Sequence, residues 1–431
     1  MDGHFDELLR RIKLTKLQRE DAKRKYTGIA KKLHDKYYVS EYNGNTKLII
    51  GSYGKKTNIR PPGDVDLLFK IPLETYERFF EYKSNGPASL LQEIKGILAE
   101  KYTTTDSIKA WGKVVLVEFS DGTHNVELLP AIEIDGVFII PNSENDGSWD
   151  SFDVRTEIDA LSESNNSTNG LTRRLIRIMK CWKQQNSTMT LKSYQIEELC
   201  IKFLEQFDSP ELSSMGNLIS ELLEWLHLNT EVDMTNIRTA YSRAQKALIY
   251  EANGQFIEAC NEWKKIFGES NFPSYSGLRE KIHKLRLAYP SQAEEFIEDI
   301  HKIRIDPAVK LSIDAKVNPN RKGFRNIEWP IVGFLKTFSA IPTQSNIYFT
   351  AQTNITGLKY LWKIRNFGNH ALRENGLRGQ IKQGSDDGRW REPTKYHGSH
   401  YVECYAIQND ICVAIARVEV PINIKLESEY E

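Results

Sequence analysis

Cysteine is scarce in this sequence, and long apolar runs are absent. Five cysteines occur in 431 residues, an odd number with no C-x-x-C pair, which argues against a disulfide framework or a zinc cluster. No apolar stretch approaches the roughly 18 residues that span a bilayer, and the first residues, MDGHFDELLRR, lack the apolar segment of a signal peptide. We therefore expect a reduced, cytoplasmic protein without a membrane partner.

Net charge is also absent, because 58 Lys and Arg balance 58 Asp and Glu. No global field selects a nucleic acid, so we infer no stable nucleic-acid partner, and any polyanion site must be a local patch. The content of 40% hydrophobic and 27% charged residues is ordinary for a globular protein. The length indicates about two or three domains.

The N-terminal part alternates between helical and strand patterns. Residues 5–37 are rich in Lys, Arg, Leu and Glu and lack proline, which predicts a helix. The runs KLIIG and DVDLLFKIP predict strands, and PASLLQEIKGILAEKY predicts a helix that starts near Pro87. The run KVVLVEFSDGTHNVELLPAI predicts a hairpin around the turn signal Asp121-Gly122. This order predicts an α/β core built around one sheet.

Two further regions follow this core. From about residue 155 to 268 the pattern is helical, and TRRLIRIMKCWKQQ places a basic ridge of Arg173, Arg177 and Lys180 opposite an apolar face. The segment YPSQAEEFIEDIHKIRIDP predicts a helical connector. Five alternating runs, KLSIDAKV, NIYFTAQT, KYLWKIRN, SHYVECYAI and ICVAIARVEVPINI, predict a small antiparallel β-sandwich. The expected domains are a core with its N-terminal helix (1–190), a helical lobe (191–275), a connector (276–304) and a β-rich domain (305–425).

Three acidic residues lie on the predicted strands of the core. Asp64 and Asp66 alternate along one strand, so their side chains point to the same face. Glu127 lies in the otherwise apolar run NVELLPAI, where an unpaired carboxylate would be costly. Shared divalent cations would neutralise these charges, activate an attacking hydroxyl and stabilise a leaving pyrophosphate. The alternative is a solvated acidic strand end.

Gly51 and Ser52 stand directly after the strand KLII. Because Gly51 has no Cβ, a backbone amide can approach a phosphate closely there, and the Ser52 hydroxyl can donate a hydrogen bond to it. Together with the carboxylates, these two residues predict nucleotidyl transfer.

The combination resembles a known superfamily. The stretch G-S-x-x-x-x-T (Gly51, Ser52 and Thr57), then Asp64-x-Asp66, then an acidic residue before Leu-Leu-Pro, resembles the polymerase-β-like nucleotidyltransferases. It looks most like the branch of oligoadenylate synthases, cyclic GMP-AMP synthase and their bacterial relatives, the CD-NTases. The resemblance covers roughly residues 40–275 and implies an α/β polymerase-β-like core with a helical lobe. It also implies that Asp64, Asp66 and Glu127 bind two Mg²⁺ ions, with Mn²⁺ as an alternative.

The resemblance continues into the helical region. The family carries a lysine in L-I-R-x-x-K-x-W and a serine in K-S-Y-x-x-E, and this sequence has LIRIMKCW and LKSYQIEEL. It therefore implies that Lys180 and Ser193 touch the donor triphosphate and that Tyr194 stacks on a base. The alternatives are an exposed helix face for Lys180, and a helix cap and a core aromatic for Ser193 and Tyr194. Trp149 and Asp150, in the expected loop NDGSWDSFD, either reach over the nucleotide or only pack.

The C-terminal runs YLWKIRNFGNHALRENGLRGQI and REPTKYHGSHYVECYAI resemble the AGS-C sensor domain, which implies a ligand-sensing module. Arg365, Arg378 and Arg389 supply local positive charge that suits a nucleotide or another anion. The candidate pocket residues, which sandwich-core and turn positions explain at least as well, are Trp362, Arg365, Asn366, Arg378, Glu392, His397 and His400. Cys404 and Cys412 are expected to be small buried residues rather than a redox switch.

The leading hypothesis is a cytoplasmic, bacterial, magnesium-dependent synthase that makes a cyclic oligonucleotide from ATP, alone or with other NTPs. The product would be a second messenger for a separate effector in CBASS-type antiphage signalling, and the C-terminal domain would take a regulatory ligand. One alternative is a linear oligonucleotide, or transfer of an NMP to a protein or RNA. Another is a sensor that binds nucleotide without catalysis.

Overall fold

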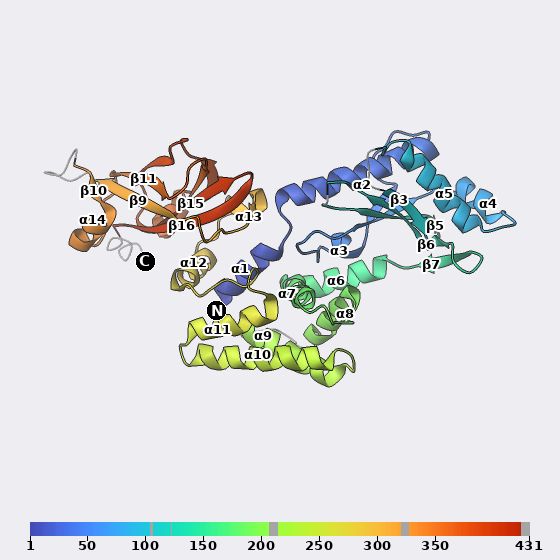
Figure 1. The fold of residues 1–431 in the computed structure, drawn as a ribbon, viewed down its shortest axis with the longest axis horizontal. Coiled ribbons are helices and arrows are strands. Elements are labelled where there is room, and N and C mark those ends of the chain that lie inside the picture. Colours follow the sequence, from blue (N-terminus) through green and yellow to red (C-terminus); the bar gives the residue numbers. More distant parts are fainter. Residues whose placement is uncertain (104–106, 122, 207–213, 320–326, 424–431) are drawn as a thin grey trace. The chain divides into compact units, whose positions relative to one another are not determined.

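The chain forms two compact units, Met1–Tyr275 and Ser276–Glu431. The computed structural model describes residues 1–103, 107–121, 123–206, 214–319 and 327–423 (Figure 1). Gly122 of the predicted turn and residues 424–425 of the predicted β-rich domain lie outside this range. No helix in the described part of the chain is both long and apolar enough to cross a bilayer.

The first unit combines a sheet with many helices. Its helices are α1 (Asp2–Ile12), α2 (Lys16–Tyr37), α3 (Gly51–Gly54), α4 (Leu73–Phe80), α5 (Gly86–Ala99), α6 (Arg155–Ser167), α7 (Leu171–Gln185), α8 (Ser193–Leu204), α9 (Met215–Asn229), α10 (Met234–Ala252) and α11 (Phe256–Phe267). Its strands are β1 (Lys47–Ile49), β2 (Val65–Lys70), β3 (Ser107–Trp111), β4 (Val114–Glu118), β5 (Val126–Ile134), β6 (Val137–Asn142) and β7 (Ser148–Phe152).

The helix predicted over residues 5–37 is in fact two helices, α1 and α2. The chain leaves helical geometry before Thr15, whose hydroxyl accepts a hydrogen bond from the Gln18 backbone N–H at 3.1 Å. The Gln18 side chain in turn accepts from the Thr15 N–H at 2.9 Å, which completes a capping box. Because of this break, α1 packs on α7 and α9 while α2 packs on α5 and β2.

The sheet is mixed, and its described strands follow the order β1-β2-β5-β4-β3, with β6 and β7 added beyond β5. Only β2 and β5 run parallel among these pairs, and Asp66 is opposite Glu127 in their register. The antiparallel pairing of β4 with β5 confirms the predicted hairpin. Leu67 belongs to a core shared with α2 and α5, whereas Leu68 belongs to a smaller core on the opposite face. Figure 1 shows α2 and α5 on one side of this sheet and α6 to α8 on the other.

The sequence predicted a loop at NDGSWDSFD and left open whether Trp149 and Asp150 reach over the nucleotide or only pack. In the structure this segment is a turn followed by β7. Asn145, Asp146 and Gly147 all have positive φ and form the turn that returns the chain into β7. Trp149 then packs edge-to-face on Tyr76, and Asp150 pairs with the Lys113 ammonium at 2.8 Å. The packing interpretation of Trp149 is therefore the correct one.

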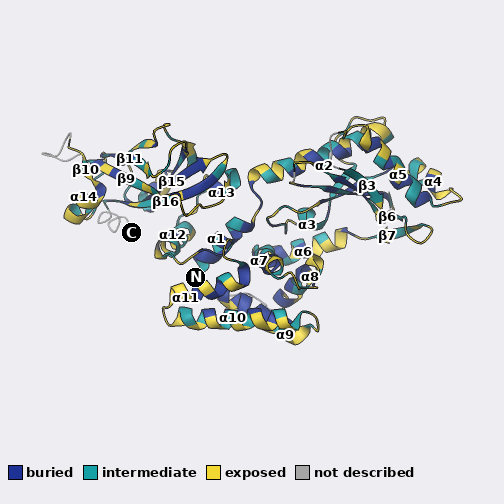
Figure 2. Ribbon diagram, in the orientation of Figure 1, coloured by how far each residue is buried: buried dark blue, intermediate teal, exposed yellow. Residues whose placement is uncertain are grey.

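The remaining helices of the first unit share a second hydrophobic core. Residues of α1 and α6 to α11 contribute to it, with Phe5, Trp182 and Trp263 among its largest buried side chains. Helices α10 and α11 are buried along one side and exposed along the other (Figure 2). This packing fixes α7 and α8, which carry Lys180 and Ser193, against the rest of the helical bundle.

The second unit is built on two sheets. Its helices are α12 (Gly277–Ala288), α13 (Ile297–Ile300), α14 (Ile331–Phe338) and α15 (Asn369–Arg373), and its strands are β8 (Lys302–Ile303), β9 (Leu311–Asn318), β10 (Trp329–Pro330), β11 (Asn346–Thr353), β12 (Lys359–Arg365), β13 (Arg378–Gln383), β14 (Arg389–Pro393), β15 (Gly398–Gln408) and β16 (Ile411–Ile422). The strand orders are β10-β9-β11-β14 and β13-β12-β15-β16-β8. Every pair is antiparallel except β16 with β8.

The five predicted runs correspond to β9, β11, β12, β15 and β16, whose inward side chains form one core between the sheets. Trp362 and Cys404 are fully buried in this core, which confirms the sandwich-core interpretation of both. The five cysteines are all free and buried, Cys412 included.

The segment predicted as a helical connector is mostly not helical. Only α13 is helical between residues 289 and 307, because Pro290 ends α12 and the following glutamates bond to the sheet instead. Glu294 accepts from Lys363 at 2.8 Å, and Glu295 accepts from the Ile381 backbone N–H at 2.7 Å. Residues 276–304 therefore belong to the second unit.

Candidate active site

The pleat of the sheet brings two of the predicted carboxylates together. Asp66 on β2 and Glu127 on β5 occupy opposed positions of neighbouring parallel strands, so both project from the same face. That face is the one opposite α2 and α5, because Val65 and Leu67 point toward those helices. Asp64 directly precedes β2 and is exposed.

Burial and like charge raise the pKa of Asp66 and Glu127. Burial, followed by the charges of Glu127 and Asp64, raises the pKa of Asp66 to about 6. Burial and the charge of Asp64 also raise the pKa of Glu127. No salt bridge joins a described basic side chain to any of the three residues. Asp66 and Glu127 are half-buried, whereas Asp64 is exposed to solvent.

Gly51 is required here for steric reasons. Its φ is +56°, and a Cβ at this position would lie 1.9 Å from the Asp66 Oδ2 atom. The Asp66 carboxylate therefore lies directly against the backbone at the start of α3, and only glycine permits this close approach. The sequence predicted a glycine for approach to a phosphate; in the structure the close neighbour is a carboxylate.

The residues fit a divalent cation by their chemistry, although they are not arranged around one. Within the described residues, no group of three or more His, Cys, Asp or Glu side chains is placed to hold a metal ion. Asp64, Asp66 and Glu127 nonetheless supply only oxygen donors, which Mg²⁺ prefers. Burial and mutual repulsion raise the pKa of Asp66 and Glu127, and a bound cation would offset both effects.

A cavity of about 640 Å³ opens beside this face. It is lined by Gly51, Ser52, Lys55, Asn58, Ile59, Pro61, Gly63, Asp66, Lys180, Lys183, Gln184, Asn186, Ser187, Met189, Ser193, Tyr194 and Glu197. The lining comes from the β1–β2 connection on one side and from α7 and α8 on the other. Asp66 and the nucleotide residues implied by the resemblance thus meet in one space, whereas Asp64 and Glu127 are not among its lining residues.

One wall of the cavity is a buried cluster of charges. The Lys180 ammonium donates to Glu197 at 2.6 Å and to the Thr57 hydroxyl at 2.9 Å. The Lys55 ammonium donates to the other Glu197 oxygen at 3.0 Å and to Glu157 at 2.5 Å. Lys180 is only 6% exposed, so the exposed-helix-face interpretation is wrong for it.

The pKa values of Lys180 and Glu197 are both lowered, for different reasons. Burial lowers the pKa of Lys180, and Glu197 offsets only part of this effect. Burial opposes the charged form of Glu197, but Lys180 and Thr57 outweigh it, so the pKa of Glu197 lies below its usual value. Two carboxylates balance the two ammonium groups, and the cluster is neutral as a whole.

The basic ridge of α7 holds the segment after α3. Arg173 Nε donates to the Lys55 carbonyl at 3.0 Å, and Arg177 donates to the Lys56 carbonyl. Lys56 has a φ of +60°, so these contacts hold a residue in the left-handed region. The ridge therefore positions the loop that carries Lys55 and Thr57 rather than facing solvent.

Lys183 is the residue that sequence reasoning missed. It lines the cavity one turn after Lys180, and its ammonium has no hydrogen-bond or ion-pair partner within the described ranges. Burial and the like charge of Lys192 lower the pKa of Lys183. Lys183 is the third residue after Lys180 in KCWK, so helical spacing alone could have placed it beside Lys180. The predicted basic ridge ended at Lys180 and did not include it.

Ser193 and Tyr194 lie at the start of α8, on the cavity wall. The residue that caps α8 is Lys192, whose N–H donates to Gln195 at 2.7 Å, so Ser193 is not the cap. Tyr194 is 59% exposed, and the core-aromatic interpretation is therefore wrong. Both side chains remain available to a molecule in the cavity.

Comparison with known proteins finds one domain match in each unit. The family model of the Second Messenger Oligonucleotide or Dinucleotide Synthetase (SMODS) domain matches residues 1–165. The model of the Adenylyl/Guanylyl and SMODS C-terminal sensor (AGS-C) domain matches residues 291–423. A probable cyclic nucleotide synthase of Bacillus cereus (strain VD146) is 25% identical over 284 residues, which cover 54% of this chain and 84% of that protein.

Two solved structures of similar proteins were also found. CdnC of E. coli MS115-1 with ATP is 16% identical, with a TM-score of 0.46, over 63% of this chain and 99% of that chain. The di-nucleotide cyclase DncV of Vibrio cholerae, in complex with GTP and 5MTHFGLU2, is 13% identical, with a TM-score of 0.48, over 63% and 96%.

The two domain matches agree with the order of the motifs and with the mixed sheet followed by helices. The α/β polymerase-β-like core with a helical lobe and the strand-rich C-terminal unit are thereby confirmed. The chain is thus a nucleotidyltransferase with a SMODS domain, as in the CD-NTases, over residues 1–165 and a C-terminal AGS-C sensor domain over residues 291–423.

Proposed function

We propose that this chain makes a cyclic oligonucleotide from ATP, alone or with a second NTP, in a magnesium-dependent reaction. The observation that carries the proposal is the unpaired carboxylate group: Asp66 is opposite Glu127 across β2 and β5, and Asp64 precedes β2. A protein that only bound nucleotide would have little use for three acidic groups that repel one another.

The carboxylates act at the reacting end. Held by Asp64, Asp66 and Glu127, Mg²⁺ would stabilise the charge on the attacking hydroxyl and on the leaving pyrophosphate, and Mn²⁺ could substitute for it. The ribose hydroxyl that attacks the α-phosphate loses its proton to a group close to Asp66 or Glu127. Gly51 keeps the backbone close to Asp66 and so fixes the position of that carboxylate.

The opposite end of the cavity suits a triphosphate. An ammonium has three N–H donors, and Lys180 spends two on Thr57 and Glu197, which leaves one for a phosphate oxygen. Lys183 has all three of its donors free of protein partners in the described part of the chain, and we assign it the same role. Ser52 and Ser193 supply hydroxyl groups on either side, and the exposed ring of Tyr194 offers a face for a base.

The product would be a second messenger that activates a separate effector. The family supports this role, because its bacterial members usually act in CBASS-type defence against phage. The AGS-C domain supports a regulated enzyme, in which a ligand of the second unit changes the rate of synthesis. We further expect the enzyme to act in the cytoplasm, where its nucleotide substrates are.

Separation of labelled products tests the proposal. Purified protein is incubated with radiolabelled ATP, the other NTPs and magnesium, and the products are separated by thin-layer chromatography before and after phosphatase. A spot that resists phosphatase supports the cyclic product. A phosphatase-sensitive oligonucleotide would indicate linear synthesis, label on the protein or an RNA would indicate NMP transfer, and no pyrophosphate release would indicate a sensor that only binds.

A further inference from the structure

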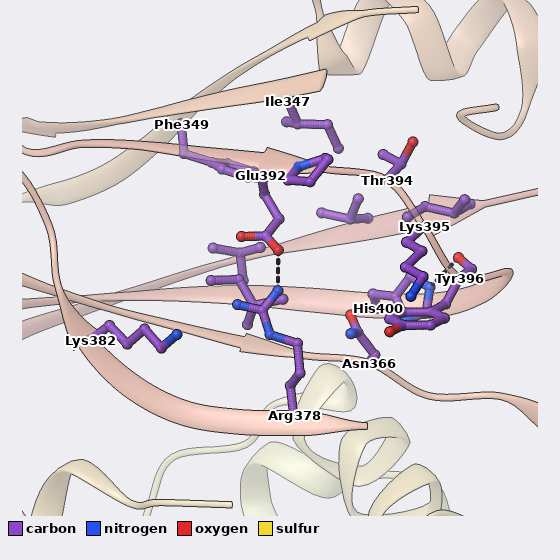
Figure 3. A pocket seen from close by; sticks show the side chains of 15 residues that line it. Ile347, Phe349, Asn366, Arg378, Lys382, Glu392, Thr394, Lys395, Tyr396 and His400 are labelled. Atoms are coloured by element: carbon purple, nitrogen blue, oxygen red, sulfur yellow. Dashed lines mark hydrogen bonds and ion pairs between the residues drawn. The ribbon is translucent and has the colours of Figure 1, made fainter. Parts of the chain in front are cut away.

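A second cavity, of about 240 Å³, lies between the two sheets of the second unit. Its apolar lining comes from β11, β12, β15 and β16, and consists of Ile347, Phe349, Ile364, Val402, Val420 and Ile422. Its polar lining comes mostly from β13, β14 and the residues that follow β14, and Figure 3 shows these side chains around the space. This cavity has no part in the nucleotide site, which lies in the other unit.

An ion pair crosses the cavity. Arg378 of β13 bonds to Glu392 of β14, and the dashed line in Figure 3 marks this contact between the two sheets. The second Glu392 oxygen accepts from Trp390 Nε1 at 3.1 Å, so both carboxylate oxygens are occupied. The remaining Arg378 donors have no protein partner in the described part of the chain. Arg378 also has a φ of +56°, an unusual backbone conformation that places its side chain in the cavity.

Positive charge exceeds negative charge around the cavity. Lys382 and Lys395 line it together with Arg378, and within the described ranges neither lysine has a hydrogen-bond or ion-pair partner. Figure 3 shows the three cationic side chains approaching from different sides. Glu392 is the one acidic residue in the lining. The space is therefore suited to an anion.

Histidine adds no charge to this balance. His400 accepts from the Phe367 backbone N–H through Nδ1 at 3.0 Å, and its Nε2 donates to the Tyr396 carbonyl at 2.9 Å. A ring with one donating and one accepting nitrogen is neutral. Burial accordingly lowers the pKa of His400 to about 4.

Asn366 adds a polar group to the cavity lining. Asn366 is 6% exposed, and its amide nitrogen donates to the Gly376 carbonyl at 2.7 Å. Its carbonyl oxygen has no hydrogen-bond partner within the described residues, and the side chain lines the space. A ligand with a hydrogen-bond donor would therefore find a free acceptor there.

We propose that this cavity binds a small organic anion with a flat apolar body. The anionic group lies against Arg378, Lys382 and Lys395, and the body lies between Phe349, Ile364 and Val402, with a donor directed to Asn366. The volume is below the roughly 300–1,000 Å³ of drug-sized sites, so the body is no larger than one or two fused rings. An aromatic carboxylic acid has this chemistry, and a nucleoside monophosphate shares its anionic group and flat ring system.

The site has a direct connection to the first helix of the second unit. His400 lines both this cavity and a small gap beside α12, and Phe367, whose N–H it binds, packs against Ile282 of that helix. A ligand that orders residues 366–367 and 400 therefore orders the surface on which α12 rests. This gives a place and a chemistry to the regulatory ligand proposed above, although binding itself does not rest on that role.

Calorimetric titration of the full chain tests the site. The probes are 2-naphthoate and AMP, with 2-naphthamide as the uncharged control and acetate as the control without a ring. The background carries Asp64→Asn and Asp66→Asn, so turnover is excluded. We expect 2-naphthoate to bind saturably and the two controls not to bind; tighter binding of AMP at the same site would indicate a nucleotide as the source.

Three variants locate the binding. Lys382→Gln should weaken 2-naphthoate about 10-fold and Arg378→Gln roughly 10- to 150-fold, while Arg389→Gln, an exposed residue outside the cavity on β14, should change nothing. Lys382 is exposed, so its variant is expected to fold even if loss of the Arg378 ion pair harms folding. No saturable binding of either anion, or binding that both cavity variants leave unchanged, would overturn the proposal. Pyrophosphate release by the wild type is measured separately, so failure here does not count against the synthase.

Discussion

The two units contain two buried charge groups with opposite electrostatics. In the first unit Asp66 and Glu127 face each other as like charges, and the pKa of Asp66 rises to about 6. In the second unit Glu294 and Glu403 face cations, and despite burial the charges of Lys363 and of Arg417 help lower the pKa of each carboxyl to about 2. Raised carboxyl pKa values mark a group that folding alone does not need, and lowered values mark one that stabilises the fold.

The prediction that three arginines of the second unit supply charge for an anion was only partly correct. Arg365 was expected to supply positive charge for an anion, but it is fully buried and bonds to Glu294 at 3.1 Å. Arg389 is exposed and pairs with Asp387 at 3.1 Å, outside the cavity. Only Arg378 of the three predicted arginines lines the cavity of the second unit. The comparison therefore predicts that removing the carboxylates of Asp64 and Asp66 lowers synthesis. Removing the Glu294 carboxylate, which pairs with Lys363 and Arg365, lowers the stability of the second unit instead.

The largest effect is expected for the double variant Asp64→Asn with Asp66→Asn. Loss of both carboxylates should lower synthesis by at least about 10³-fold, while the fold remains intact. Pyrophosphate release at saturating magnesium measures this, with Asp35→Asn on the exposed face of α2 as a control for loss of a surface carboxylate. Wild-type turnover by the double variant would refute the role assigned to the carboxylates.

The next largest effect is expected for Glu294→Gln. This change leaves Lys363 and Arg365 buried without their carboxylate and should lower the free energy of unfolding of the second unit by about 3–5 kcal/mol. Urea unfolding followed by tryptophan fluorescence measures it. Exposed Glu295→Gln is the neighbouring control, although it also loses one bond to a backbone N–H. A Glu294→Gln protein that is as stable as the wild type but has lost synthesis would contradict the structural role assigned to Glu294.

The carboxyl groups of Glu294 and Glu403 also predict how stability depends on pH. A carboxyl whose pKa is lowered by folding stabilises the protein above its ordinary pKa, and that contribution disappears as the pH falls through the folded value. For Glu294 and Glu403 the window runs from the ordinary value of 4.5 down to about 2. The wild-type second unit should therefore lose stability between these pH values, and Glu294→Gln should lose less. Equal slopes in the two proteins would contradict the pairing.

A smaller effect separates the two lysines of the nucleotide cavity. Lys183→Met should raise the KM for ATP roughly 10- to 150-fold without changing stability, because its ammonium has no protein partner in the described part of the chain. Lys180→Met should raise KM and also lower the melting temperature, since Glu197 loses a buried partner. Exposed Lys202→Met on α8 is the control. If neither lysine affects KM, the triphosphate lies elsewhere.

The smallest effect concerns Asp66 in the absence of metal. Ionisation of Asp66 costs stability once the pH exceeds the ordinary value of 3.8, and the cost is complete above about 6. Asp66→Asn should therefore raise the melting temperature of the protein at pH 7.5 in EDTA. Added magnesium should raise the melting temperature of the wild type and not that of the variant. Equal shifts in both proteins would place the metal elsewhere.

The sequence predicted the first site better than the second for a physical reason. The direction of the Asp66 and Glu127 side chains follows from strand alternation, which is a local property, so acidic groups on one face could be foreseen even though the β2–β5 pairing itself is not local. Arg378 and Glu392 meet across two sheets, and β13 and β14 are polar edge strands without apolar alternation. Thr15 likewise broke a continuous helical pattern through two local bonds that composition does not reveal.

Burial was the other property that the sequence did not reveal. Lys180 and Arg177 have the spacing of an exposed basic ridge, yet Lys180 is buried because Glu197 and Thr57 approach it from other segments. The acidic residue of LKSYQIEEL was visible but received no role before its partners were known. Lys183 became a candidate only because the structure shows which cations already have carboxylates.

The measurement that tests the central claim most directly is mass spectrometry of the products formed from all four NTPs with magnesium. The account predicts a product whose mass equals a whole number of NMP units, each less one water, with no terminal phosphate. It also predicts that this mass is absent when Asp64 and Asp66 are both asparagine. Unchanged NTPs with wild-type protein, or a product that keeps its 5′-triphosphate as the only new mass, would contradict the account.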